Sequence, residues 1–188
     1  MAEKIKILGI VGSLRKNSYN GALAKEAAKL IPQDAEMELT GIEGIPVFNQ
    51  DDEQNPPRAV VDFKRKIRAA DGILFFTPEY NYSIPGPLKN AIDYASRPYG
   101  DNAFSGKAAA IASASIGMLG GARAQYHLRQ TFVFLNMHAL NMPEVLVTFA
   151  PQKFDESMNL KDDATKQYLS QLLRNLVDLA RSLKTGTA

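Results

Sequence analysis

Hydroxyl, amide and guanidinium side chains gather in one short stretch near the N-terminus, which runs Gly12-Ser13-Leu14-Arg15-Lys16-Asn17-Ser18-Tyr19-Asn20. Its glycine permits a tight turn, and the helix start that follows offers unpaired backbone N–H groups and a favourable dipole. Arg15 adds a guanidinium that can bind two phosphate oxygens, and Ser13, Ser18 and Asn20 add neutral donors. The pattern predicts a pocket for a monophosphate. The alternative is that Ser18 or Asn20 only caps the helix.

Two common nucleotide-binding motifs are missing from the sequence. No two glycines are spaced G-x-G, so the chain lacks the dinucleotide fingerprint. Gly106-Lys107 is followed by alanine and has no glycine five positions before Gly106, so the chain lacks a P-loop. The predicted phosphate pocket is therefore neither the usual NAD-binding loop nor an ATPase loop.

Two further loops have an unusual composition. The first runs Thr77-Pro78-Glu79-Tyr80-Asn81-Tyr82-Ser83-Ile84-Pro85-Gly86-Pro87, and its prolines hold the backbone rigid. Such a loop can hydrogen-bond a flat heterocycle and cover it with tyrosine rings, or it can be a stiff connection whose tyrosines pack into the core. The second runs from Ser115 to Gly121 and holds three glycines. They let a backbone approach a ligand closely, although glycine also simply turns chains.

Composition narrows the possible chemistry. The chain has no cysteine, which excludes disulfides, thiolate zinc sites, iron–sulfur clusters and cysteine nucleophiles. With only His127 and His138, a histidine-rich metal site is not expected. The net charge is +2, and the basic run at 64–68 has no aromatic platforms, so we do not expect nucleic-acid binding. No stretch approaches the ~18 apolar residues of a membrane span, and we expect a soluble cytoplasmic protein.

Strand and helix patterns alternate along the whole chain. The predicted strands cover 5–11, 37–41, 72–77, 107–112 and 144–149, and the predicted helices cover 22–31, 57–67, 87–95, 121–135 and 165–183. This alternation predicts one α/β domain over residues 1–188, a doubly wound parallel sheet of five strands with helices on both faces. Ligands bind such sheets beyond the carboxyl ends of the strands. The three unusual loops are therefore expected to meet at one site.

In this order, the three loops resemble the NADPH-dependent FMN reductase family, and most closely its bacterial quinone and chromate reductase branch. The most specific segments are 77–93 and 120–130, the latter with Gly120-Gly121-Ala122-Arg123 and Tyr126-His127-Leu128-Arg129-Gln130. The resemblance implies a flavodoxin-like sheet of order 2-1-3-4-5, one FMN per subunit, and a homo-oligomer that is a dimer or a dimer of dimers. It implies that the FMN phosphate is held by Ser13, Arg15, Ser18 and Asn20. Around the isoalloxazine ring it implies Pro78, Glu79, Tyr80, Asn81, Tyr82 and Ser83, with Ser115 and Gly117 nearby.

The expected activity is transfer of hydride from NADPH or NADH, through FMN, to small oxidants such as quinones, flavins or chromate. Because the flavin performs the chemistry, no side chain is assigned a certain catalytic role. Glu79 could donate a proton, contact another subunit or lie solvated at the surface. Arg123 and Arg129 could attract nucleotide phosphates, or form interface ion pairs or a solvated face. Two alternatives remain: a flavodoxin-type electron carrier, which the net charge of +2 disfavours, and a flavin-binding sensor without turnover.

The helix predicted over 121–135 is apolar around much of its circumference. A helix buried on the sheet alone would leave some of these side chains in water, and such patches usually mark association sites. We therefore expect this helix to form part of a subunit interface. The side chains concerned are Tyr126, Leu128, Phe132, Val133, Phe134 and Leu135.

Overall fold

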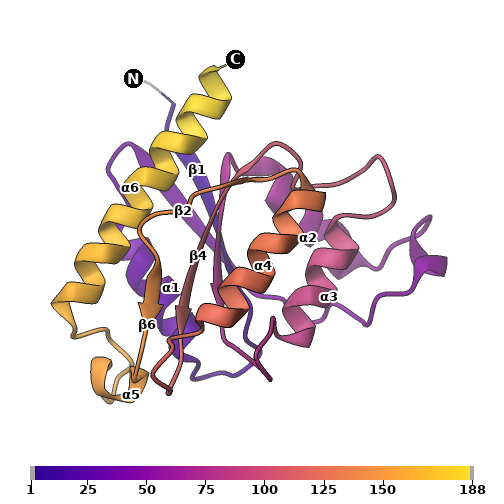
Figure 1. Cartoon of the computed structure of the whole chain (residues 1–188). Helices are drawn as coiled ribbons and strands as arrows, with labels where there is room; N and C mark the ends of the chain where they lie inside the picture. The colour runs from indigo at the N-terminus through magenta and orange to yellow at the C-terminus, as the bar shows by residue number, and fades with distance from the viewer. Residues whose placement is uncertain (1–2, 187–188) are drawn as a thin grey trace.

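A parallel sheet lies at the centre of the protein (Figure 1), and the computed structural model describes residues 3–186. The strand order is β2-β1-β3-β4-β5, with β6 also paired to β4, and every pairing is parallel. The predicted order 2-1-3-4-5 is therefore confirmed. The strands are β1 Ile5–Val11, β2 Ala35–Thr40, β3 Gly72–Thr77, β4 Ala108–Ala114, β5 His138–Ala139 and β6 Val145–Val147.

The fifth position of the sheet is shared by two short strands. β5 pairs with the start of β4, at Ala108↔His138, and β6 pairs with its end, at Ala112↔Val145. The prediction of one strand over 144–149 is therefore wrong in extent, and His138, which lies outside every predicted strand, belongs to β5. Between these pairings, the five residues 140–144 stand opposite only the two residues 110–111 of β4, so this segment leaves the ladder. Pro143 lies in it and has no N–H to donate to a ladder.

The five predicted long helices are all present, with shifted ends. α1 begins before its predicted start because Ser18 caps it, and α6 begins where the Asp162 carboxylate accepts a bond from the Thr165 N–H. The short α5 was not predicted. The helices are α1 Tyr19–Leu30, α2 Arg58–Ala69, α3 Gly86–Ala95, α4 Ala122–Leu135, α5 Ala150–Lys153 and α6 Asp163–Thr185, with a 3-10 turn at Gln50–Asp52.

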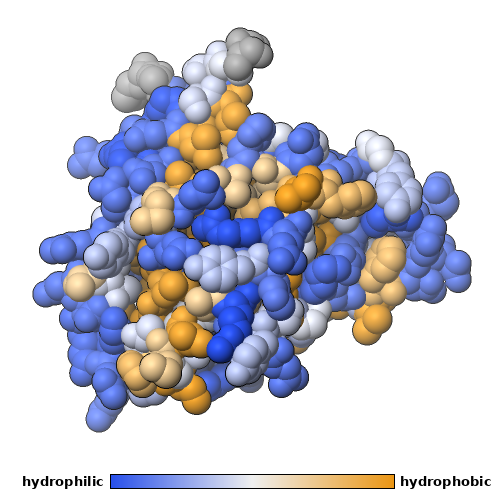
Figure 2. Space-filling model, in the orientation of Figure 1, coloured by the Kyte–Doolittle hydropathy of each residue, from blue (hydrophilic) through white to orange (hydrophobic). Residues whose placement is uncertain are grey.

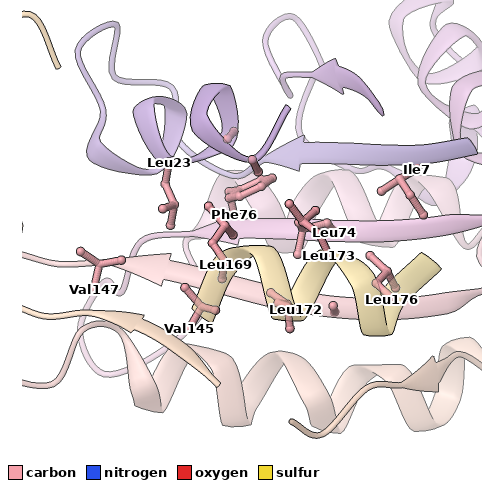
Figure 3. Close-up of a cluster of buried hydrophobic side chains, with 14 of the residues drawn as sticks. Ile7, Leu23, Leu74, Phe76, Val145, Val147, Leu169, Leu172, Leu173 and Leu176 are labelled. Atoms are coloured by element: carbon pink, nitrogen blue, oxygen red, sulfur yellow. The ribbon is translucent and has the colours of Figure 1, made fainter. Parts of the chain in front are cut away.

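Helices cover both faces of the sheet. On one face, α1 and α6 pack against inward side chains such as Leu74 and Phe76 (Figure 3). On the other face, α2, α3 and α4 pack against Ile73 and Phe75. Alternate residues of β3 thus enter opposite cores, which explains why this strand reads as a continuous apolar run. None of the helices within residues 3–186 has the length and apolar character needed to cross a membrane.

The register of the sheet brings the three unusual loops to one edge. Val11, at the end of β1, pairs with Phe76, and Thr77, at the end of β3, pairs with Ser113 of β4. The connections that leave these three strands therefore begin at nearly the same level. This is the edge where ligands bind in doubly wound sheets.

Candidate functional site

The loop after β1 forms a capped helix start with donors around it. The Gly12 N–H donates to the Phe76 carbonyl at 2.8 Å, which ties the loop to β3. The Ser18 hydroxyl accepts from the N–H groups of Asn20 and Gly21 at 3.2 and 3.4 Å. A hydroxyl that accepts these bonds can still donate its own proton to a ligand. The helix-cap alternative is thus correct for Ser18 without removing it from a phosphate pocket.

Ser13 and Arg15 lie in the same turn. The buried Ser13 hydroxyl accepts from the Arg15 N–H at 3.3 Å, and the Arg15 side chain is exposed. The guanidinium can therefore reach an anion beside the start of α1, where the helix dipole favours negative charge. Together with Ser18, these residues form the part of the site suited to a phosphate.

Asn20 has a different position from the one its loop suggested. Its side chain is buried, Nδ2 donates to the Ala114 carbonyl at 3.0 Å, and Oδ1 accepts from the Ala114 N–H at 2.9 Å. The amide thus joins the start of α1 to the end of β4. It sets the spacing between two loops of the site. Because Nδ2 carries two N–H donors and the bond to the Ala114 carbonyl uses one of them, the expected contact of Asn20 with the phosphate stays a prediction.

The loop after β3 contains a tight hairpin. Tyr80 and Ser83 exchange two backbone hydrogen bonds, of 3.1 and 3.0 Å. The central residues, Asn81 and Tyr82, both have positive φ, 49° and 66°, as in the turns that usually carry Asn-Gly. A tyrosine in this region is strained. The residues Tyr80 and Tyr82 are 50% and 64% exposed, so the alternative that they pack into the core is wrong.

Glu79 joins this loop to α4. Its Oε2 accepts from the N–H groups of Arg123 and Ala124 at 3.1 and 3.3 Å, and its Oε1 lies 3.5 Å from Nη1 of Arg123. The side chain is only 14% exposed, so the solvated role is wrong. The carboxylate faces the helix start and not the hairpin turn.

Two more side chains of α4 contact the hairpin. The Arg123 guanidinium lies 3.8 Å from the centre of the Tyr82 ring, within cation–π range. The His127 Nδ1 lies 2.9 Å from the Ser83 hydroxyl. Arg129, by contrast, donates to the Leu140 carbonyl at 2.9 Å. Of the two arginines considered for nucleotide binding, Arg123 therefore lies at the site and Arg129 is bonded to the segment after β5.

Gln125 is a site-supporting residue that the sequence analysis missed. It is fully buried, and its Nε2 donates to the Ser113 hydroxyl at 2.8 Å and to the Val145 carbonyl at 3.0 Å. The Ser113 hydroxyl donates in turn to the Gly120 carbonyl at 2.6 Å. The sequence feature that indicates its role is a polar residue on the face of α4 that also carries Leu128 and Phe132. Such a residue needs buried partners.

The glycines at the start of α4 have little space. Gly120 and Gly121 have φ of 59° and 89°. A Cβ at Gly120 would lie 2.8 Å from the Leu146 carbonyl carbon, and one at Gly121 would lie 2.8 Å from the Ser113 side chain. The turn thus needs glycine for both its conformation and its close approach to β4 and β6.

Ser115 and Gly117 form the outer part of this turn. The Ser115 hydroxyl accepts from the Gly117 N–H at 3.2 Å, and the Gly117 carbonyl accepts from the Phe149 N–H at 3.1 Å. A Cβ at Gly117 would meet only Ser115 Oγ, at 3.8 Å, so this side is open. The neighbouring Ile116 and Met118 are exposed, and Figure 2 shows hydrophobic patches between polar side chains toward the end of the molecule where the strands finish.

The assembled site suits a flat ligand with an anionic tail. The capped start of α1 offers the anion site, while the tyrosine hairpin and the open turn at Gly117 offer apolar and hydrogen-bonding surfaces. Among residues 3–186, no three His, Asp or Glu side chains are grouped closely enough to hold a metal ion.

Comparison with known proteins finds relatives that match nearly the whole chain. A family model described as NADPH-dependent FMN reductase matches residues 5–152. An NAD(P)H-dependent FMN reductase of Pseudomonas aeruginosa is 52% identical over 98% of this chain and 100% of its own length. An NAD(P)H:quinone oxidoreductase of Solanum tuberosum is 48% identical over 96% and 95% of the two chains, respectively.

Solved structures show the same fold. A flavoenzyme NAD(P)H:(acceptor) oxidoreductase from Paracoccus denitrificans is 35% identical and superposes with a TM-score of 0.86, over 95% of this chain and 98% of that one. An archaeal flavodoxin, 9% identical, superposes with a TM-score of 0.59 over 94% and 99% of the two chains. That likeness concerns the fold alone. The match to the family model includes all three loops of the site.

Proposed function

Since the chain belongs to the NADPH-dependent FMN reductase family, we propose that it binds FMN at the three loops and transfers reducing equivalents from NADPH or NADH to quinones. Free flavins and chromate are further acceptors in this proposal. The observation that supports it most directly is the convergence of an anion-binding helix start and an exposed tyrosine hairpin at one edge of the sheet. A flavin mononucleotide has one phosphate and one flat ring, and it matches both parts.

The residues at the site suit this cofactor. Ser13, Arg15, Ser18 and Asn20 would hold the phosphate, and the ring would lie between the Pro78–Ser83 segment and the turn at Ser115 and Gly117. Bound FMN would supply the redox chemistry, which is hydride acceptance from the nicotinamide and electron transfer to the acceptor. The protein binds and orients the ring, and the exposed rings of Tyr80 and Tyr82 offer a surface for flat acceptors.

The cofactor is tested by releasing it from denatured protein and identifying it by chromatography. We expect FMN, because the phosphate pocket is single and the dinucleotide fingerprint is missing. Recovery of FAD, or no uptake after FMN is added, would contradict the proposal.

The reaction is tested by steady-state rates with both nucleotides against a quinone, free flavin and chromate. Because nucleotide and acceptor would use one site in turn, we expect parallel lines in double-reciprocal plots. Intersecting lines would show a ternary complex and contradict the shared site. A protein that binds FMN but does not oxidise either nucleotide with any acceptor would be a carrier or a sensor.

We also propose that the protein works as a dimer or a dimer of dimers in the cytoplasm. Its association is attributed to the outer face of α4, where Tyr126, Val133 and Phe134 are exposed.

A further inference from the structure

α4 has no side-chain cap of its own. Its N-cap residue is Gly121, which has no side chain that could accept from the first N–H groups of the helix. The Glu79 carboxylate accepts from Arg123 and Ala124 instead. The cap is thus supplied by a residue 44 positions away, from the loop that carries the tyrosine hairpin.

The hairpin needs external support. Asn81 and Tyr82 are both held in the left-handed region, and neither is a glycine. Three contacts with α4 surround this turn: Glu79 with the helix start, Arg123 over the Tyr82 ring, and His127 beside the Ser83 hydroxyl. Of these side chains Glu79 is the central one, because it fixes the backbone of Arg123 and also pairs with its guanidinium.

We propose that Glu79 is a positioning residue of the flavin site, which acts by holding the 80–83 hairpin against α4 and not by touching the cofactor. The conformation of Tyr82 would then depend on a carboxylate that is bonded to the start of α4. The proposal deepens the proposed function, since it rests on the hairpin lining the flavin ring. It gives Glu79 a role different from proton donation.

The test compares Glu79→Ala and Glu79→Gln with Asp162→Ala. Asp162 is the matched control, because its carboxylate also caps a helix, at the Thr165 N–H, but belongs to α6. The measurements are the melting temperature, the FMN dissociation constant, the visible spectrum and midpoint potential of bound FMN, and hydrogen exchange of the Tyr80 and Ser83 amides in FMN-free protein.

In Glu79→Ala we expect the FMN dissociation constant to rise about tenfold, the size expected for one or two lost hydrogen bonds. The spectrum and potential should shift, and the two hairpin amides should exchange faster. Glu79→Gln keeps an oxygen for both helix N–H groups and should stay within about threefold of wild type in FMN affinity, since it loses only the charge facing Arg123. Asp162→Ala should lower the melting temperature and leave the other values unchanged.

Wild-type exchange, spectrum and FMN affinity in Glu79→Ala would overturn the proposal and reduce Glu79 to a helix cap. If wild-type protein takes up no FMN, the proposed function fails. Amide exchange in the FMN-free protein still tests the role of Glu79: faster exchange in Glu79→Ala would support the positioning role, and unchanged exchange would overturn it. If Glu79→Ala does not fold, Glu79→Asp takes its place, because a carboxylate that is one methylene shorter keeps the charge but withdraws the oxygen from the N–H groups of Arg123 and Ala124. Faster exchange of the Tyr80 and Ser83 amides in this variant would support the proposal, and unchanged exchange would overturn it.

Discussion

A single side-chain amide can join two segments that are distant in sequence, and Asn20 does so here. Its two hydrogen bonds satisfy both backbone groups of Ala114, which is itself buried at the end of β4. Without them, a buried N–H and a buried C=O would lose their partners. Each unsatisfied buried group costs ~1–3 kcal/mol, so the position is important for stability as well as for the site.

Asn20→Ala should therefore lower the free energy of unfolding by about 2–4 kcal/mol. Urea unfolding monitored by circular dichroism measures this. Asn17→Ala is the control, since Asn17 lies in the same loop and is exposed, and it should stay within about 0.5 kcal/mol of wild type. A similarly small effect for Asn20→Ala would mean that Ala114 finds other partners.

Arg15→Ala should weaken FMN binding without unfolding the protein. A charge-assisted hydrogen bond contributes ~1.5–3 kcal/mol, so the dissociation constant should rise roughly 10- to 100-fold. Fluorescence titration of the FMN-free protein measures it. Lys16→Ala removes a neighbouring exposed charge and should change affinity far less, and equal losses in both variants would indicate only a general electrostatic effect.

At the residue scale, the sequence predicts the contacts that a side chain makes inside its own loop, but it does not predict those made across the sheet. The cap at Ser18 follows from the residues directly after it. The partners of Asn20 and Glu79 lie 94 and 44 residues away, and no local pattern identifies them. Gln125 was detectable only as a polar residue on an apolar stripe.

At the scale of elements, the turn before α4 contains Gly120 and Gly121, which both have positive φ and are closely surrounded by other atoms. Other glycines with positive φ, such as Gly100, have free space around them. A Cβ added at Gly121 would lie 2.8 Å from the Ser113 side chain. A Cβ added at Gly100, where φ is 85°, would have no neighbour within 4 Å. The two positions share the backbone conformation and differ in the space available. Alanine substitutions at Gly100 and Gly121 therefore distinguish the cost of backbone strain from the cost of a steric clash.

Gly100→Ala should lower the free energy of unfolding by ~1 kcal/mol, the cost of the left-handed conformation alone. Gly121→Ala should cost more, about 2–4 kcal/mol, because the Ser113–Gln125 contacts must also move. Thermal or urea unfolding compares the two variants. Equal losses would show that the turn shifts to make room.

The elements themselves were predicted with one error in the sheet. Each buried strand reads as an apolar run and each long helix as an amphipathic pattern, so the order and the α/β class followed from the sequence and the family resemblance. The split of the last strand did not, because only two residues of β5 and three of β6 pair with β4. Such short pairings leave no periodicity to detect.

At the scale of the whole molecule, the outer face of α4 is the surface through which we propose that copies of the protein associate. Val133 and Phe134 are 84% and 70% exposed. Beside them, a hollow of about 450 Å³ lies between α3 and α4, and Phe134, Leu135 and Tyr99 line it. Exposed apolar side chains next to a groove are typical of protein interfaces.

Phe134→Glu should lower the molar mass in solution, because a charge would be placed in the proposed interface. Light scattering at micromolar concentration measures it. Val61→Glu, at a half-exposed position on α2, is the control and should leave the mass unchanged. A monomeric wild type would contradict the proposed association, and a variant of wild-type mass would move the interface away from Phe134.

The interrupted fifth strand also bears on how the protein avoids aggregation. An exposed, long and regular edge strand can pair with the edge of another molecule. Here one edge consists of β5 and β6, separated by a segment that contains Pro143, and the other is β2, which carries Glu36 and Glu38. Neither edge offers a long uncharged ladder of free N–H and C=O groups. Further β-sheet growth is therefore discouraged at both edges, and the proposed association would use the helical faces.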